Sequence, residues 1–317
     1  MVIAFFGTPR FAVPTLQQLL DSHHVVAGVV TQPDRPRGRG QRVTDAPVKA
    51  LAVARQIPVL QPERLKPADV AYALRAWRPD LGVVAAYGRI IPEHLLSIPR
   101  FGIINVHASL LPKYRGAAPV HRAVINGEPE TGVTIMRLVK ELDAGPMFTK
   151  ATRPIGPDET SDVVEDALAH LGADLLLRTV DQIAAGTAHE EPQDHSRATY
   201  APRLTKEEGL IDWSRPASAV HDRVRGLHPW PHAYTFFNGT RLIVLRTNPR
   251  GSADRKGPPN ISPGTILEVT REAIRVATGD GGQLSIFELQ AEGRRPMNVR
   301  DFAAGHPIRQ GSVFSES

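Results

Sequence analysis

The feature that most constrains the fold is a series of short, continuous apolar runs in the first 189 residues. These runs are Val2–Phe6, Val25–Val30, Asp80–Ala86 and Gly102–His107. Strands that are apolar on both faces are typical of a parallel sheet covered by helices. Between the first two runs, Val13–Ser22 carries apolar residues at helical spacing. The alternation therefore predicts an α/β, Rossmann-like domain with a mostly parallel sheet.

Further elements of the same domain follow in the chain. Thr131–Val139 and Pro146–Arg153 are predicted strands, and Ser161–Ala185 is a predicted long helix. Thr160, Ser161 and Asp162 supply capping side chains at the start of that helix. The polar stretch after Gly186 has no clear periodicity. We therefore expect a first domain over 1–189 and a linker over 190–205.

After the linker the pattern changes to short strand-like runs separated by turn residues. Asn238-Gly239 lies between the runs Trp230–Phe237 and Arg241–Arg246, and this dipeptide is a strong hairpin signal. Three more runs follow, at Thr265–Val269, Ile274–Thr278 and Leu284–Leu289. The pattern predicts a small β-barrel domain over 206–317. Arg250–Pro263, rich in Gly, Pro and charge, is expected to be a mobile surface loop.

Composition excludes several classes of protein. With 317 residues, the chain exceeds the usual size of one hydrophobic core, and 41% of its residues are hydrophobic. No apolar run approaches the roughly 20 residues of a membrane helix, and no signal peptide is recognisable. We therefore expect a cytoplasmic protein without membrane association. The chain has no cysteine, which excludes disulfides, Cys-ligated zinc and a thiol nucleophile.

The net charge of +5 is concentrated toward the C-terminal third. Up to residue 200 there are 22 basic against 21 acidic residues, and beyond it 16 against 12. A modestly basic module can bind a polyanion such as a nucleic acid. The alternative is codon bias, because 31 of the 38 basic residues are arginines.

Common cofactor motifs are not found. The sequence has no P-loop, and Gly7-Thr8-Pro9-Arg10 after the first strand does not match the dinucleotide-binding fingerprint. His221, His228 and His232 do not have the spacing of helical metal ligands, because Pro229 and Pro231 interrupt the segment. We therefore expect no metal.

Asn105 and His107 are the first candidates for chemistry. They are two residues apart at the end of a predicted buried strand, so their side chains share one face. Open α/β sheets bind ligands at such strand ends. A carboxamide beside an imidazole can stabilise an oxyanion and transfer a proton, although structural hydrogen bonds would explain the pair equally well. Asp143 lies in a predicted Gly-bearing turn, where turn formation is the simpler interpretation.

A resemblance to a known family extends over most of the chain. The sequence resembles the methionyl-tRNA formyltransferase family, within the folate-dependent formyltransferase superfamily. The motifs that carry it are Phe6–Pro9, Thr31–Gly40, Val84–Gly88, Asn105–His107, Ser109–Pro112, Arg115–Pro119, Thr131–Met136, Leu142–Gly145, Lys206–Glu208, Ile211–Trp213 and Pro229–Pro231.

The resemblance implies a site and its substrates. An Asn, a His and an Asp form the superfamily's catalytic trio, and Asn105, His107 and Asp143 match them. The formyl donor is 10-formyltetrahydrofolate, with no metal, and the matching donor-site residues are Ser109, Leu110, Leu111, Pro112, Tyr87 and Gly88. A basic loop in the family contacts initiator methionyl-tRNA, and the matching residues are Arg35, Arg37, Arg39 and Arg42. The resemblance also implies that an OB-like C-terminal barrel binds tRNA, and no obligate protein partner is expected.

Two alternatives stay open. A folate-dependent formyltransferase acting on a nucleotide-sugar amine or another small amine would keep Asn105, His107 and Asp143. The arginine-rich segment Arg35–Gly40 disfavours it, because a small substrate would not need that loop. A non-catalytic RNA-binding protein on the same fold is disfavoured because the trio is intact.

Overall fold

The chain folds into two compact units. The computed structural model describes residues 1–37, 42–65, 67–249 and 261–315. Unit 1 contains residues 1–119, 130–153 and 165–202, and unit 2 contains residues 120–129, 154–164 and the chain from 203 onward. The units therefore do not follow the chain continuously, and the domain limits expected from the sequence stay a prediction.

Unit 1 is built around one sheet. Among the described residues its strands occur in the order β10 (Met147–Pro154), β9 (Glu130–Arg137), β7 (Ile103–His107), β6 (Leu81–Ala85), β1 (Val2–Gly7), β2 (Val25–Val30) and β5 (Val59–Leu60). From β7 to β5 every pairing is parallel, whereas β9 runs antiparallel to β7. Every residue of β6 and β7 is buried, as expected for strands covered on both faces. The predicted Rossmann-like sheet is confirmed.

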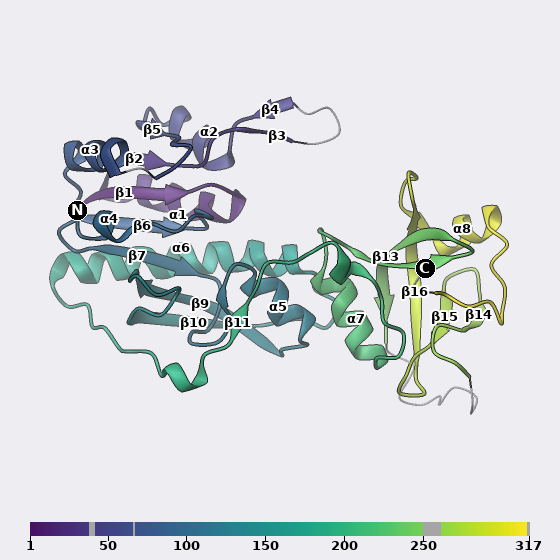
Figure 1. Ribbon diagram of the computed structural model, residues 1–317. Coiled ribbons are helices and arrows are strands. Elements are labelled where there is room, and N and C mark those ends of the chain that lie inside the picture. Colours follow the sequence, from purple (N-terminus) through teal and green to yellow (C-terminus); the bar gives the residue numbers. More distant parts are fainter. Residues whose placement is uncertain (38–41, 66, 250–260, 316–317) are drawn as a thin grey trace. The chain divides into compact units, whose positions relative to one another are not determined.

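Helices cover this sheet on both sides (Figure 1). They are η1 (Arg10–Ala12), α1 (Val13–Leu20), α2 (Pro47–Ala54), α3 (Pro67–Trp77), α4 (Glu93–Leu96) and the greater part of α6 (Ser161–Ala185). The bounds of α6 agree with those expected from the sequence. Its length follows from a long run without proline, preceded by Thr160, whose hydroxyl lies 2.5 Å from an Asp162 carboxylate oxygen.

The basic loop after β2 contains a two-stranded ribbon. Strands β3 (Arg35–Arg37) and β4 (Arg42–Thr44) pair antiparallel, with Arg37 opposite Arg42. We call the segment Arg35–Thr44 the basic arm; Figure 1 shows its two strands, β3 and β4, beside α2. Its base is held by Asp34, which accepts hydrogen bonds from Lys49 and Gln61. Arg39 lies outside the described residues.

The stretch 190–201, which we call the return segment, packs on unit 1 instead of crossing freely between domains. Glu191 forms a β-bridge with Met147, and β11 (Tyr200–Ala201) pairs in parallel with β8 (Arg115–Gly116). The short helix η2 (His195–Arg197) lies between these contacts. The backbone of this stretch is therefore hydrogen-bonded within unit 1. Its polar composition alone is typical of a linker.

Unit 2 contains an antiparallel sheet and a few helices. In the described part of the chain the strand order is β12 (Ala233–Phe237), β13 (Thr240–Asn248), β16 (Gln283–Ala291), β15 (Ile274–Ala277) and β14 (Ile266–Val269), with β17 (Met297–Asn298) on β16. The helices are α5 (Pro119–Ile125), η3 (Glu207–Gly209), α7 (Ala217–Gly226) and α8 (Val299–Gly305). Asn238 and Gly239 both have positive φ and form the predicted hairpin turn between β12 and β13.

Residues 312–315 join the two edges of this sheet. Phe236 of β12 exchanges backbone hydrogen bonds with Ser315 at 3.0 and 2.9 Å. On the other side, the Ile266 amide of β14 donates to the Ser312 carbonyl at 2.7 Å. Both outer strands are thus paired with one segment, and the sheet closes into the small barrel expected from the sequence. The segment 250–260, part of the expected mobile loop, lies outside the described residues.

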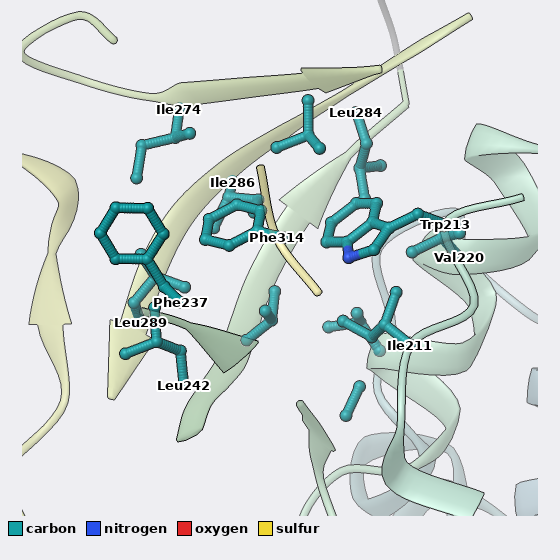
Figure 2. Close-up of a cluster of buried hydrophobic side chains, with 14 of the residues drawn as sticks. Ile211, Trp213, Val220, Phe237, Leu242, Ile274, Leu284, Ile286, Leu289 and Phe314 are labelled. Atoms are coloured by element: carbon teal, nitrogen blue, oxygen red, sulfur yellow. The ribbon is translucent and has the colours of Figure 1, made fainter. Parts of the chain in front are cut away.

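Aromatic side chains fill the barrel. Phe314 from the closing segment packs 5.7 Å from the Trp213 ring and 5.9 Å from the Phe237 ring, between centroids. Figure 2 shows Phe314 between these rings, over Ile286 of the central strand β16. The closing segment therefore contributes to the core as well as to the backbone pairing.

Two segments from the middle of the chain belong to unit 2. His121 of α5 donates a hydrogen bond from Nδ1 to the Gly226 carbonyl at 2.8 Å. Ser161, at the start of α6, donates to the same carbonyl at 2.8 Å. The last carbonyl of α7 is thus satisfied by side chains more than sixty residues away in sequence.

Among the described residues, the helices include none that could span a membrane.

We expect Phe314→Ala to lower the free energy of unfolding of unit 2 by about 3–5 kcal/mol, because it empties a buried aromatic position. Thermal and denaturant unfolding of the full chain would measure the change. Val313→Ala is the matched control, since Val313 is 50% exposed and Phe314 only 2%. Equal, small effects of both substitutions would show that the closing segment does not contribute to the core.

Candidate active site

The site is built where the parallel strands of unit 1 end. The Thr8 hydroxyl, directly after β1, donates to the Tyr87 carbonyl after β6 at 3.3 Å. The side chain of Gln32, after β2, donates to the same carbonyl at 2.7 Å. Three strand ends are therefore tied together by side chains. This edge is the usual position of a ligand site in an open α/β sheet.

Asn105 and His107 lie on β7 at this edge, as predicted. Both are buried, with 9% and 5% of their surface exposed, and their register partners on β9 are Met136 and Thr134. Among the described residues, the Asn105 carboxamide has no hydrogen-bond partner, so both of its N–H groups remain available. A side-chain amide whose N–H groups are not used within the protein is suited to a bound oxygen.

The hydrogen bonds of His107 define its tautomer. Its Nε2 lies 3.0 Å from the Tyr114 carbonyl oxygen, which can only accept. Nε2 therefore carries the proton, and in the neutral ring Nδ1 bears the lone pair. Nδ1 lies 3.8 Å from Oδ2 of Asp143. Nδ1 of His107 and Oδ2 of Asp143 are both hydrogen-bond acceptors, so together they can bind a proton or an N–H group that lies between them.

Asp143 enters the site from the turn between β9 and β10. Its backbone has φ +48°, a left-handed conformation that Asp tolerates better than most residues. Its Oδ2 accepts a hydrogen bond from the Gly116 amide at 2.8 Å. The structure thus brings Asp143 next to His107, although the sequence alone favoured a simple turn residue.

The stretch Ser109–Pro112 closes on itself beside β9. Ser109 is fully buried and donates to the Lys113 carbonyl at 2.6 Å, while the Leu111 amide donates to the Thr134 hydroxyl at 3.1 Å. The Leu111 side chain joins a small core cluster with Met136 and Met147. Leu110 and Pro112 are only partly buried. Ser109 and Leu111 therefore hold the loop, and Leu110 and Pro112 are the two that remain available to a ligand.

Tyr87 and Gly88 follow β6 at the same edge. Tyr87 is 1% exposed and packs edge-to-face against Phe6, with ring centroids 5.8 Å apart. Its hydroxyl is buried and has no hydrogen-bond partner among the described residues, and burial raises the pKa of this phenol. The hydroxyl is therefore protonated and has an unused donor. Gly88 has φ +77°, and a Cβ there would lie 2.7 Å from the Gln32 amide nitrogen.

The expected basic residues lie on a separate element from Asn105, His107 and Asp143. Arg35, Arg37 and Arg42 lie on the two strands of the basic arm, with Arg37 and Arg42 directly opposite each other. Lys49, beside Asp34 and Asp45, fixes the base of the arm, and its hydrogen bond lowers the pKa of Asp34. The arm is thus a structured arginine-bearing ribbon.

His221 and His24, outside the site, both have hydrogen-bond partners. Both ring nitrogens of His221 have partners, Thr247 Oγ1 and the Pro157 carbonyl, each at 2.9 Å. In the described part of the chain, one set of possible metal-ligand atoms converges, from His23, His24 and Asp181. His24 there contacts Asp181 at 3.0 Å and the Met1 amino nitrogen at 3.1 Å, so hydrogen bonds explain this cluster too.

The geometry described above is that of a group-transfer site at the carboxyl edge of a Rossmann-like sheet. The chain belongs to the formyl transferase family. The formyl transferase domain matches residues 1–180, and the formyl transferase C-terminal domain matches residues 203–307.

Relatives of known function are similar over their whole length. Methionyl-tRNA formyltransferase of Geotalea uraniireducens is 46% identical, with 100% of this chain and 98% of the relative covered. The proteins of the same name from Pelobacter propionicus and Alkaliphilus oremlandii are 49% and 45% identical, covering 98% and 100% of this chain and 95% and 100% of the relatives.

Solved structures share the fold at low sequence identity. The sugar 3N-formyl transferase WlaRD, determined with dTDP and 5-N-formyl-THF, has a TM-score of 0.67 at 16% identity, covering 93% of this chain and 99% of that one. An N-formyltransferase from Helicobacter canadensis, with folinic acid and dTDP-3-aminofucose, has a TM-score of 0.66 at 18% identity, covering 90% and 99%. The expected two-domain formyltransferase fold is confirmed.

Sequence reasoning missed the residues that support the site from outside the motifs. Gln193 of the return segment donates from Nε2 to the carbonyls of Asp143 and Gly145, each at 2.8 Å. Its side chain was not identified because it lies in a stretch of Glu, Pro, Gln and Asp, typical of a linker. Thr134 was within a quoted motif, but nothing in its pattern indicated that it bonds Ser109.

We expect Tyr87→Phe to leave the free energy of unfolding unchanged or raise it by about 1 kcal/mol, because the lost hydroxyl has no partner. If this hydroxyl donates to the formyl donor, the variant raises the KM for that donor about tenfold, equivalent to about 1.4 kcal/mol. Denaturant unfolding and steady-state kinetics would measure both. Tyr72→Phe is the control, since Tyr72 is 77% exposed. A loss of stability in Tyr87→Phe would contradict the view that the Tyr87 hydroxyl has no partner within the protein.

Proposed function

We propose that this protein transfers the formyl group of 10-formyltetrahydrofolate to the α-amino group of methionine on initiator methionyl-tRNA. The reaction class follows from membership of the formyl transferase family, and the acceptor from full-length relatives at 45–49% identity with that name. Folate derivatives in structures of the same fold support the donor. A cytoplasmic location, where translation begins, is part of the proposal.

The observation that carries the proposed chemistry is the arrangement of Asn105, His107 and Asp143. One residue offers unused N–H donors, the second a lone pair on Nδ1, and the third a carboxylate 3.8 Å from that nitrogen. Formyl transfer to an amine needs an oxyanion donor and an acceptor for one proton. These three side chains supply both functions without a nucleophile on the protein.

The reaction proceeds by addition and elimination. The neutral α-amine attacks the formyl carbon, and the carbonyl oxygen gains negative charge. The Asn105 N–H groups stabilise that oxygen. His107 accepts the proton that the amine nitrogen loses, at Nδ1, and the nearby Asp143 carboxylate stabilises the imidazolium by Coulomb attraction. When the bond to folate N10 breaks, His107 returns the proton to that nitrogen, so that the proton count balances.

The basic arm and the barrel are the proposed contacts for tRNA. The arm follows β2 in the chain and carries Arg35, Arg37 and Arg42 on its two strands, and guanidinium groups bind phosphate in a bidentate manner. In the barrel, Arg241 lies 3.8 Å above the Tyr234 ring, a pair able to stack on a base. These groups provide charge and stacking that a small acceptor would not require.

A nucleotide-sugar amine is the second candidate acceptor. The solved structures of sugar formyltransferases share the fold, at 16–18% identity. Formyl-transfer assays with charged initiator tRNA and with an amino-sugar nucleotide would separate the two. Turnover with the sugar nucleotide and none with the tRNA would overturn the proposed acceptor.

We expect Asn105→Ala, His107→Ala and Asp143→Ala each to lower kcat about 100-fold or more, because each group acts in the transition state. Single-turnover kinetics with charged tRNA would measure the loss, and circular dichroism would verify folding. Gln18→Ala serves as the control, because Gln18 hydrogen-bonds only Asp174 in the described structure. Near-normal turnover of any folded variant removes that residue from the mechanism.

We expect the double substitution of Arg37 and Arg42 by Ala to weaken tRNA-dependent turnover and to flatten its salt dependence. Each lost phosphate contact lowers the slope of log K against log salt by about 0.7–0.9. The KM for the folate donor should stay constant. A matched pair of exposed arginines, Arg75 and Arg178, provides the control. An unchanged salt slope in the arm variant would leave the barrel as the tRNA contact.

A further inference from the structure

Gln193 of the return segment makes contacts that converge on the catalytic turn. We propose that Gln193 is a positioning residue that holds the Asp143 carboxylate toward His107. This inference rests on the proposed function, because it concerns how the catalytic carboxylate is oriented. Gln193 is 5% exposed, and none of its hydrogen bonds leads to solvent. A buried glutamine that spends every polar atom on one neighbourhood indicates a defined structural task.

The carboxamide of Gln193 binds the turn through its backbone. Nε2 donates to the Asp143 carbonyl and to the Gly145 carbonyl, each at 2.8 Å. A primary amide has two N–H groups, so both are used on carbonyls of one turn. Holding these two carbonyls fixes the peptide plane between Asp143 and Ala144 and the one between Gly145 and Pro146.

The turn needs such support because its backbone is unfavourable. Asp143 has φ +48°, and a Cβ on Gly145 would lie 2.0 Å from the Arg137 carbonyl oxygen. Left-handed backbone persists where the surroundings hold it. If the turn relaxed, Oδ2 of Asp143 would leave both the Gly116 amide, now at 2.8 Å, and His107 Nδ1, now at 3.8 Å.

Arg115 determines which way the Gln193 amide faces. Its Nε and one terminal nitrogen donate to Oε1 of Gln193, at 3.1 and 2.6 Å. Because arginine can only donate, Oε1 must face Arg115 and Nε2 must face the turn. The next residue, Gly116, binds the Asp143 carboxylate. Gln193 therefore holds the backbone of the turn, and Gly116 holds the Asp143 carboxylate. Both contacts depend on β8, because Arg115 and Gly116 form that strand.

The return segment itself is anchored on both sides of Gln193. On one side, Glu191 exchanges two backbone hydrogen bonds of 2.8 Å with Met147, and Glu190 pairs with Arg137. On the other, the Thr199 carbonyl accepts from the Arg115 amide at 2.9 Å. Gln193 thus projects from a fixed backbone, which is what a positioning residue requires.

We expect Gln193→Leu to lower kcat by about 10- to 100-fold with the donor KM within about twofold, because a misplacement of about 1 Å costs up to that factor. Gln193→Glu should do the same although it retains the acceptor for Arg115, since its oxygen would face two carbonyls. Gln18→Leu and Gln18→Glu are the matched controls on α1 and should leave kcat unchanged.

A double-mutant cycle with Asp143→Asn tests whether Gln193 acts through Asp143. In the Asp143→Asn background, Gln193→Leu should have little further effect on single-turnover rates, because the group it positions is already lost. Additive losses would overturn the inference. So would a large loss in Gln193→Leu combined with a normal rate in Asp143→Asn.

Amide hydrogen exchange at Gly116 provides a readout that does not depend on activity. Its acceptor is the Asp143 carboxylate, so exchange should accelerate both in Asp143→Ala and in Gln193→Leu. Unchanged exchange in folded Gln193→Leu would overturn the inference. If the wild-type protein formylates no methionyl-tRNA, the proposed function fails on its own, while this measurement still decides the role of Gln193.

Discussion

The structure depends on how parallel strands end. Where β1, β2 and β6 finish, their backbone groups lose sheet partners and must be satisfied by side chains or a ligand. Here the Tyr87 carbonyl receives donors from both Thr8 and Gln32, so the strand ends are closed by a small hydrogen-bond network. The same edge carries the Asn105 carboxamide, and the buried Tyr87 hydroxyl has no partner among the described residues. Unit 1 thus satisfies the backbone at its strand ends and leaves a side-chain donor unused in the part of the chain that the structure describes.

The sequence predicted what periodicity and local chemistry determine. Helix α6 and strand β7 follow from continuous patterns, and the placement of Asn105 and His107 at a strand end follows from β7. Asp143 was a candidate through family resemblance alone, because a left-handed backbone and a 3.8 Å approach to His107 arise from tertiary contacts. Catalytic roles for these residues stay predictions until variants are measured.

The parts that are hardest to predict from sequence are those whose residues form hydrogen bonds with other segments of the protein. Composition suggests a linker for the return segment, but Gln193 and Thr199 spend their polar groups on the site loops. The two short strands of the basic arm contain Pro36 and several arginines, and pairing of only three residues on each side leaves no periodic signal. In both cases the information lies in partners distant in sequence, which no local pattern contains.

Unit 2 includes residues 120–129 and 154–164, although the two family domains span 1–180 and 203–307 as consecutive modules. The Gly226 carbonyl, for example, is bound by His121 and Ser161. Exchange of the C-terminal module between family members would therefore leave such contacts mismatched unless both inner segments travelled with it. Chimaeras of this enzyme class should therefore be joined at the boundaries of packing, not at the boundaries of sequence homology.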